Sequence, residues 1–290
     1  TVIYANDGVG YQHILPIEDW KMSFRDIKKD NILLNDDLEA FLSAPFDLSS
    51  DYMFRARLYD LSEDEYVFAG TLHHISSDGW SQAILIGEFV ELYNAQLSGK
   101  KANLTELTLQ YADYAIWQQN YLEGEFINQQ LSYWEEKLAD VNALQLPTDY
   151  ARPAVQSFEG ETITFELDKD LSSNIYKLSQ KEGVTAFMTL LATFKVLMSR
   201  YSSQEDISIG TPIAKRTQKD LEGLIGFFVN TLALRTQVNK NDSFKDLLQA
   251  VKQTTINAYD HQQTPFEKVV ERVVKTRDMS MSPLFQVMFA

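Results

Sequence analysis

The sequence predicts a mixed α/β protein of two lobes, each of the α+β class with helices and sheet in two layers. Segments of alternating apolar residues lie next to segments with helical spacing along all 290 residues. This length suits one large or two medium domains. The segment LPTDYARP at 146–153 breaks the periodicity with two prolines. We therefore expect an N-terminal lobe at 1–146, a linker at 147–159 and a C-terminal lobe at 160–290.

The elements of the N-terminal lobe follow from residue spacing. The alternating segments that predict strands are 2–6, 10–15, 53–61 and 65–72. The first two flank a hairpin turn at Asp7-Gly8, and the last two pair across a turn at 62–64. The segments with helical spacing are 23–42, 80–97, 111–122 and 130–138.

The C-terminal lobe shows the same mixture. Strands are predicted at 161–167 and 207–212, in the apolar run before Asn230, and at 283–290. Helices are predicted at 169–182, 185–200 and 243–259, and from a capping box at 264–267 to about Val274. Because the chain starts inside a hairpin and stops inside a core strand, it looks clipped at both ends.

Composition excludes several classes of function. The formal net charge of -15 argues against nucleic acid or an anionic membrane as a partner. The absence of cysteine excludes disulfides, thiolate zinc sites and cysteine nucleophiles. No apolar run approaches the ~20 residues of a membrane span, and the N-terminus is not a signal peptide. We expect a soluble, cytoplasmic protein.

One stretch, EYVFAGTLHHISSDGWS at 65–81, has the elements of a chemical site. A buried strand runs into His73 and His74, and a helix starts after Gly79. Successive strand side chains point to opposite faces, so one histidine is structural and the other is available for chemistry. Asp78 near the helix start is expected to cap it or to pair with a buried arginine.

Other reaction types lack their residues in this sequence. Neighbouring histidines on a strand diverge, and no HExxH motif accompanies them, so we expect no zinc site here. The nucleophile motif GxSxG and the phosphate loop GxxxxGK[ST] are absent. A histidine acting alone remains, as a general base or as a positioning acceptor for a nucleophile that the substrate brings. Asn230 either delivers its amide to a cavity or satisfies loop backbone. Arg55 and Arg57 share one strand face, which we expect to meet solvent.

The heptad HHISSDG resembles the HHxxxDG signature of condensation domains of nonribosomal peptide synthetases. Four further stretches resemble motifs of that family in the same order. They are YADYAIWQ from Tyr111, IGFFVNTLALR from Ile225, HQQTPFE from His261 and RDMSMSPLFQVMF from Arg277. The combination of DGWS with FFVNTLALR resembles the subtype that joins an L-configured donor to an L-configured acceptor.

The resemblance implies a fold and a reaction. The fold would be a chloramphenicol-acetyltransferase-like pseudodimer, with two lobes in a V and a central tunnel. His74 would assist attack of the acceptor amine on the donor thioester. His73, Asp78 and Gly79 would support it, while Ser81 and Asn230 would lie near the tunnel and position substrate. The domain itself would bind no cofactor and no metal. Its substrates would arrive on the phosphopantetheine of upstream and downstream carrier domains, beside an adenylation domain.

The sequence also departs from the family pattern. An N-terminal RHExLRTxF-like motif is missing, and with it the arginine that normally pairs with the motif aspartate. Asp78 would then lack a partner, which is destabilising for a buried carboxylate. Two alternatives to peptide-bond formation stay open: a non-catalytic module that docks carrier domains, and an acyltransferase that forms esters or uses a free acceptor.

Overall fold

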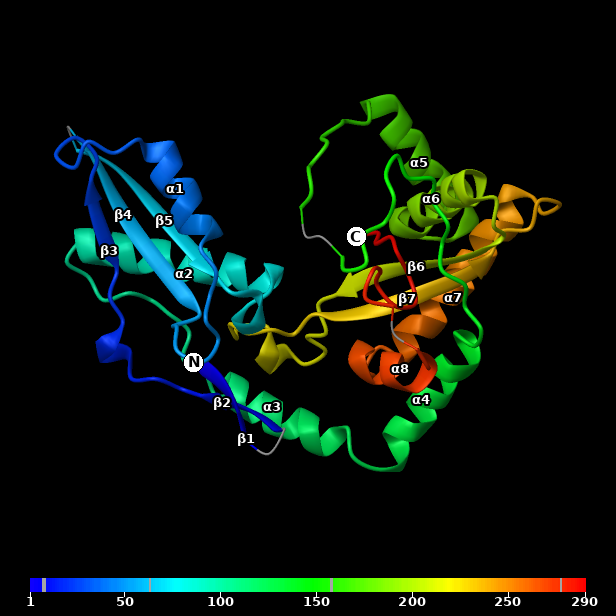
Figure 1. Cartoon of the computed structure of the whole chain (residues 1–290), viewed down its shortest axis with the longest axis horizontal. Helices are drawn as coiled ribbons and strands as arrows, with labels where there is room; N and C mark the ends of the chain where they lie inside the picture. The colour runs from blue at the N-terminus through cyan, green and yellow to red at the C-terminus, as the bar shows by residue number, and fades with distance from the viewer. Residues whose placement is uncertain (7–8, 63, 157–158, 277) are drawn as a thin grey trace. The chain divides into compact units, whose positions relative to one another are not determined.

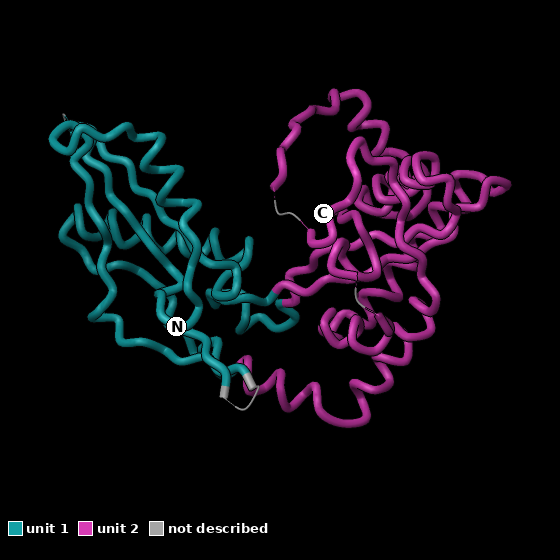
Figure 2. The backbone as a smooth tube through the Cα atoms, viewed as in Figure 1, with its two compact units in different colours: residues 1–113, 216–228 teal, residues 114–215, 229–290 magenta. Residues whose placement is uncertain are grey.

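The chain is described from a computed structural model, which covers residues 1–6, 9–62, 64–156, 159–276 and 278–290. The predicted turns at Asp7-Gly8 and around Glu63 lie outside the described residues. The chain forms two compact units, coloured separately in Figure 2. The first comprises residues 1–113 and 216–228, and the second comprises residues 114–215 and 229–290.

The first unit holds a small mixed sheet (Figure 1). The strands of this unit are β1 (Val2–Asn6), β2 (Val9–His13), β3 (Ser23–Asp26), β4 (Phe54–Ser62) and β5 (Glu65–Leu72), of which β3, β4 and β5 make the mixed sheet. Its helices are α1 (Leu34–Ser43), α2 (Gly79–Leu97) and the first residues of α3 (Tyr111–Tyr121), with short 3-10 turns η1 (Ile17–Asp19), η2 (His74–Ser76) and η3 (Lys219–Leu221). β4 pairs antiparallel with β5 and parallel with β3, whereas β1 and β2 form a separate hairpin.

Helices contact both faces of the sheet in the first unit. On one face, Phe41 of α1 packs with Tyr59 and Ala69. On the other, Phe89 of α2 stacks on Phe68, with ring centroids 4.8 Å apart. Phe68 and Ala69 are successive residues of β5, so their side chains point to opposite faces. β5, which contributes to both faces, leads directly into the histidine pair.

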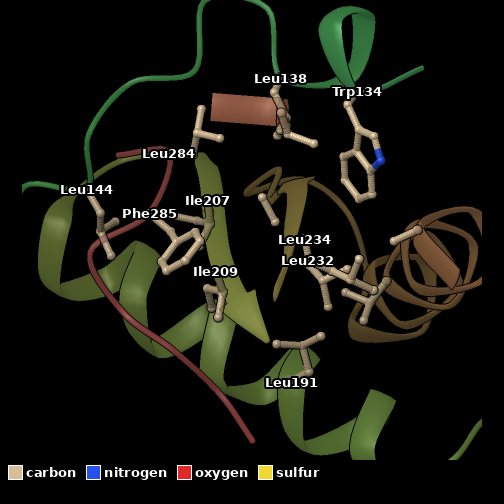
Figure 3. Close-up of a cluster of buried hydrophobic side chains, with 14 of the residues drawn as sticks. Trp134, Leu138, Leu144, Leu191, Ile207, Ile209, Leu232, Leu234, Leu284 and Phe285 are labelled. Carbon is tan, nitrogen blue, oxygen red and sulfur yellow. The ribbon is translucent and has the colours of Figure 1, made fainter. Parts of the chain in front are cut away.

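The second unit is built around two antiparallel strands. β6 (Asp206–Ile213) pairs with β7 (Asn230–Gln237). The helices are α4 (Glu125–Lys137), α5 (Lys169–Glu182), α6 (Ala186–Ser202), α7 (Phe244–Asp260) and α8 (Phe266–Val273). Figure 3 shows how their buried side chains meet, with Ile207 and Ile209 from β6 beside Leu232 and Leu234 from β7.

The C-terminal segment 283–290, predicted as a strand, lies along β6 but pairs with it only briefly. The N–H of Gly210 donates to Val287 O at 3.0 Å, and the N–H of Phe289 donates to Gly210 O at 2.9 Å. They make one isolated parallel bridge, Gly210 to Met288. The ring of Phe285 packs directly on Gly210, where any side chain would overlap it.

Two other strand predictions were wrong. Residues 161–167 form no strand, and Ile163 and Phe165 are 85% and 78% exposed. Alternation supplies strand propensity, but a strand forms only where a partner accepts its hydrogen bonds. The apolar run before Asn230 is also not a strand, since β7 begins at Asn230 instead of ending there.

The helix predicted at 23–42 exists only at 34–43. Its first part is β3, which pairs in parallel with residues 57–60 of β4. Pairing with a neighbouring strand has overridden the helical spacing of these residues.

The compact units have bounds that differ from those of the predicted lobes. The segment 147–159 does lack helix and strand where it is described, but both its sides belong to the second unit. Trp134 and Leu138, before this segment, are buried in the same cluster as Leu234 and Val269, after it. The prolines interrupt local periodicity, whereas the shared apolar core decides which segments fold together.

Candidate functional site

The histidine pair lies where β5 ends and α2 begins. The N–H of His73 donates to Met53 O at 2.9 Å, which extends the ladder between β4 and β5 by one bond. η2 then turns the chain, and Asp78 caps α2 by accepting from the N–H of Ser81 at 2.9 Å. A carboxylate at this position is favoured because it satisfies a free N–H group and faces the positive end of the helix dipole.

His74 is exposed, and its ring has a defined orientation. Its Nδ1 lies 2.7 Å from the carbonyl oxygen of Ser77. A carbonyl can only accept, so Nδ1 carries the proton and Nε2 of the neutral ring keeps a free lone pair. The ring of Phe227 meets the imidazole at 84°, with centroids 5.3 Å apart. This arrangement presents a proton acceptor at Nε2.

Apart from its backbone bond to Met53, the described contacts of His73 lie within its own turn and with the ring of Phe46. Its Nδ1 accepts from the N–H of Ile75 at 3.1 Å, and its carbonyl accepts from Ser76. Its ring meets Phe46 edge to face at 5.7 Å. Accepting at Nδ1 defines the neutral tautomer with the proton on Nε2. The ring thereby shapes the turn that presents His74.

Asp78 is 2% exposed and is paired, which corrects the expectation that it would lack an arginine. Nη2 of Arg216 donates to its two oxygens at 3.1 and 3.4 Å. The N–H of Phe228 donates to it at 3.0 Å. Burial acts to raise the pKa of Asp78, but hydrogen bonds from Ser81 and Phe228 and the charge of Arg216 outweigh it, so the pKa lies below its ordinary value of 3.8.

Arg216 ties the segment 216–228 to the start of α2. Its side chain is 1% exposed. Its Nη1 donates to the carbonyls of Leu221 and Leu224 at 2.5 and 2.8 Å. Its guanidinium lies 3.9 Å from the ring centroid of Phe228. One buried cation thus bridges a carboxylate, two carbonyls and an aromatic face, which arginine does better than lysine because its donors form a planar fork.

Ser81 is 1% exposed, and its hydroxyl bonds to the protein. Its Oγ lies 2.7 Å from Asp78 and 2.9 Å from the carbonyl of Gly226, and it accepts from Arg216 and from the N–H of Gly226. These contacts join the segment 216–228 to α2, and the expectation that Ser81 positions substrate stays a prediction.

Gly79 has open space where a side chain would lie, since no described atom outside its chain neighbours and its own helix backbone comes within 4 Å of an added Cβ. Packing inside the protein therefore does not explain the glycine. The family expectation, that it leaves room for reacting groups, stays a prediction.

Asn230 belongs to the second unit, and its amide bonds to loop backbone. Nδ2 donates to the carbonyls of Gln262 and Thr264 at 2.9 and 2.8 Å. Oδ1 accepts from the N–H of Phe266 at 3.0 Å. Asn230 therefore caps α8 in place of the predicted Thr264 capping box, and Thr264 Oγ1 has no hydrogen-bond partner among the described residues. This is the backbone-satisfying alternative that the spacing left open.

Arg55 and Arg57 are part of the sheet's packing with α1 and are not solvent residues. Arg57 is 16% exposed and pairs with Asp37 at 2.5 Å. Arg55 donates to the carbonyls of Ala44 and Pro45 and stacks on Phe46. Arg55 thereby holds the loop after α1, whose Phe46 meets the ring of His73, whereas Arg57 binds α1 itself.

Sequence reasoning missed the contacts that Arg216 makes with Asp78 and that Phe227 makes with His74. A buried arginine was one of the two partners expected for Asp78, but spacing could not identify Arg216 as that arginine. Among the described residues, no group of three His, Asp or Glu side chains is arranged to hold a metal ion. Within the same described ranges, no single helix is long and apolar enough to cross a membrane, although α5 and α6 meet that test together as a pair bent by 103°.

Comparison with known proteins places these features in one family. A family model described as Condensation domain matches residues 1–290. The chain is 44% identical over 295 residues to one of the proteins that make up linear gramicidin synthase of Brevibacillus parabrevis. That match covers 100% of this chain and 6% of the relative, so the chain spans a small part of that protein's length. Malpinin synthetase of Mortierella alpina is 42% identical over 294 residues, which cover 100% of this chain and 4% of that protein.

Solved structures show the same similarity. The X-domain from teicoplanin biosynthesis matches with a TM-score of 0.90 and 28% identity, covering 99% of this chain and 65% of that one. The same X-domain has been solved in a complex with OxyB. Holo-AB3403, a four-domain nonribosomal peptide synthetase, matches with a TM-score of 0.83 and 27% identity, covering 99% of this chain and 22% of that one. The chain belongs to the condensation-domain family of the nonribosomal peptide synthetases.

Proposed function

We propose that this chain forms a peptide bond between a donor acyl thioester and the amine of an acceptor aminoacyl thioester, both held on phosphopantetheine of carrier domains. The observation that supports it is the exposed His74 ring, whose Nδ1 bonds to Ser77 at 2.7 Å and leaves Nε2 as an acceptor. In family terms, the two lobes would form a pseudodimer around a tunnel that the two arms enter. The carrier domains and a neighbouring adenylation domain would be its partners.

The proposed reaction needs one proton acceptor. The acceptor nitrogen attacks the thioester carbonyl carbon, a C–N bond forms and the C–S bond breaks. The amine loses one proton, which Nε2 of His74 accepts and passes to the departing thiolate. Most of the rate enhancement would come from holding two tethered reactants together. Asp78 stays ionised and paired with Arg216, so it takes no part in proton transfer.

The test replaces His74 and measures dipeptide formation between two loaded carrier proteins. We expect His74→Ala to lower the rate by about 10² or more, the usual contribution of a positioned acid or base. His13→Ala is a matched control, because His13 is an exposed histidine of the same unit. Equal rates for His74→Ala and the wild type would contradict the assigned role.

A docking module is the second candidate. It is favoured by the match to an X-domain that was solved together with another protein. This candidate predicts that carrier proteins bind while neither the wild type nor His74→Ala makes product. An ester or a product with a free acceptor would instead support the remaining alternative, an acyltransferase of the same superfamily.

A further inference from the structure

Two contacts hold the imidazole of His74. The hydrogen bond from Nδ1 to Ser77 fixes one edge of the ring at 2.7 Å. A single hydrogen bond leaves the ring free to tilt about that bond. The ring of Phe227, perpendicular to it at 84°, restricts this tilt. The direction of Nε2 therefore depends on where Phe227 is placed.

Phe227 lies between η3 and β7, where residues 224–229 form no helix or strand, so its position needs other support. The hydroxyl of Tyr111 donates to the carbonyl of Phe227 at 2.8 Å. The tyrosine ring also meets Phe228 at 82°, with centroids 5.2 Å apart. It lies so close to Gly226 that a Cβ there would overlap it. One side chain thus contacts three successive residues.

The opposite side of the same segment is held by the histidine motif. The N–H of Gly226 donates to Ser81 Oγ at 3.1 Å, and the N–H of Phe228 donates to Asp78 at 3.0 Å. Phe227 is the residue between these two bonds. Its backbone is therefore clamped between Tyr111 and the start of α2, all within the first unit.

We propose that Tyr111 is a positioning residue for His74 and acts through the ring of Phe227. The hydroxyl fixes the Phe227 carbonyl, the backbone fixes the phenyl ring, and the ring fixes the plane of the imidazole. This inference rests on the proposed function of His74. Its test therefore includes a measurement that needs no product.

That measurement is the tautomer of His74 in protein labelled with ¹⁵N-histidine. The chain has four histidines, so the ring-nitrogen signals can be assigned by single substitutions. We expect the wild type to show the proton on Nδ1 of His74, and Tyr111→Phe to show a mixture of both tautomers. Tyr59→Phe is the matched control, because it removes another buried hydroxyl of the first unit, bonded to Asp37 at 2.8 Å. Identical His74 signals in the wild type and Tyr111→Phe would overturn the inference.

Kinetics of dipeptide formation supply the second measurement, made with the whole module that contains the chain. Tyr111→Phe should lower kcat by about tenfold to a hundredfold and leave KM for the carriers unchanged. Phe227→Leu should do the same, and the double variant should be no slower than the slower single variant. Additive losses would show that Tyr111 does not act through Phe227. A wild type without product would refute the proposed function, while the tautomer would still decide the role of Tyr111.

Discussion

A buried carboxylate needs a cation, and for Asp78 that cation comes from 138 residues further along the chain. Both side chains of the pair are 1% exposed. Each ion has lost its hydration, so the removal of either partner leaves an uncompensated buried charge. The pair also joins two segments that local interactions would not bring together.

We therefore expect Arg216→Met to be strongly destabilising, by about 3–5 kcal/mol in the free energy of unfolding. Arg272→Met is the control, since the Arg272–Glu135 pair is half exposed and should contribute less than about 1 kcal/mol. Urea unfolding of both variants measures the difference. Similar losses of unfolding free energy in the two variants would show that the buried pair stabilises the fold no more than the exposed pair does.

At the scale of elements, α6 is joined to both strands of the second unit by one lysine. Lys195 is fully buried, and its Nζ donates to Ile207 O at 3.0 Å and to Leu234 O at 2.5 Å. Burial, together with the charge of Lys137, lowers the pKa of Lys195 to about 7, although Asp206 acts to raise it. The neutral amine has two N–H donors, which match the two carbonyls.

This lysine makes stability depend on pH. Its folded pKa lies below the unfolded value of 10.5, so the unfolded chain binds the extra proton between pH 7 and 10.5. The stability of the wild type should therefore rise with pH in this window, by up to about 1.4 kcal/mol per pH unit from this group. This contribution should be lost as the pH falls towards 7.

The measurement compares urea unfolding of wild type and Lys195→Met at several pH values between about 7.5 and 9.5. Lys195→Met should lose this part of the slope of unfolding free energy against pH, because methionine fills a similar volume without titrating. Lys240→Met should keep the wild-type slope, since Lys240 is 64% exposed. A variant with the slope of the wild type would mean that Lys195 is charged in the folded state.

At the scale of the whole molecule, both compact units are assembled from both sides of the segment 147–159. The first unit joins Asp78 to Arg216, and the second joins Trp134 to Leu234. A break in the segment would leave these contacts in place. The predicted lobes, by contrast, would part at this segment.

Limited digestion with chymotrypsin can distinguish the compact units from the predicted lobes. Tyr150 and Phe165 are 87% and 78% exposed and lie in a stretch whose described residues form no helix or strand, so brief digestion should cleave there first. We expect the large fragments on either side of this stretch to elute together in gel filtration and to separate only in denaturant. Fragments that separate in buffer would favour the boundary at 147–159.

Local spacing in the sequence predicted most helices and the strands 53–61, 65–72 and 207–212 correctly, because periodic apolar spacing is a property of each segment. It also placed the histidine pair at the end of a strand and before a helix. The same spacing failed at 161–167, where no described strand pairs with the segment, and at 23–26, where pairing with β4 replaced a helix. Strand formation depends on residues that lie elsewhere in the chain.

Only the tertiary structure showed which distant residues contact the histidine motif. Asp78 and His74 could be identified from the sequence, but Arg216 and Phe227 reach them across more than a hundred residues. The side-chain amide of Asn230 likewise accepts a hydrogen bond from the start of α8, where the sequence suggested a local cap. Sequence spacing determines which groups neighbour each other along one element, whereas burial and unsatisfied polar groups determine which distant residues must meet them.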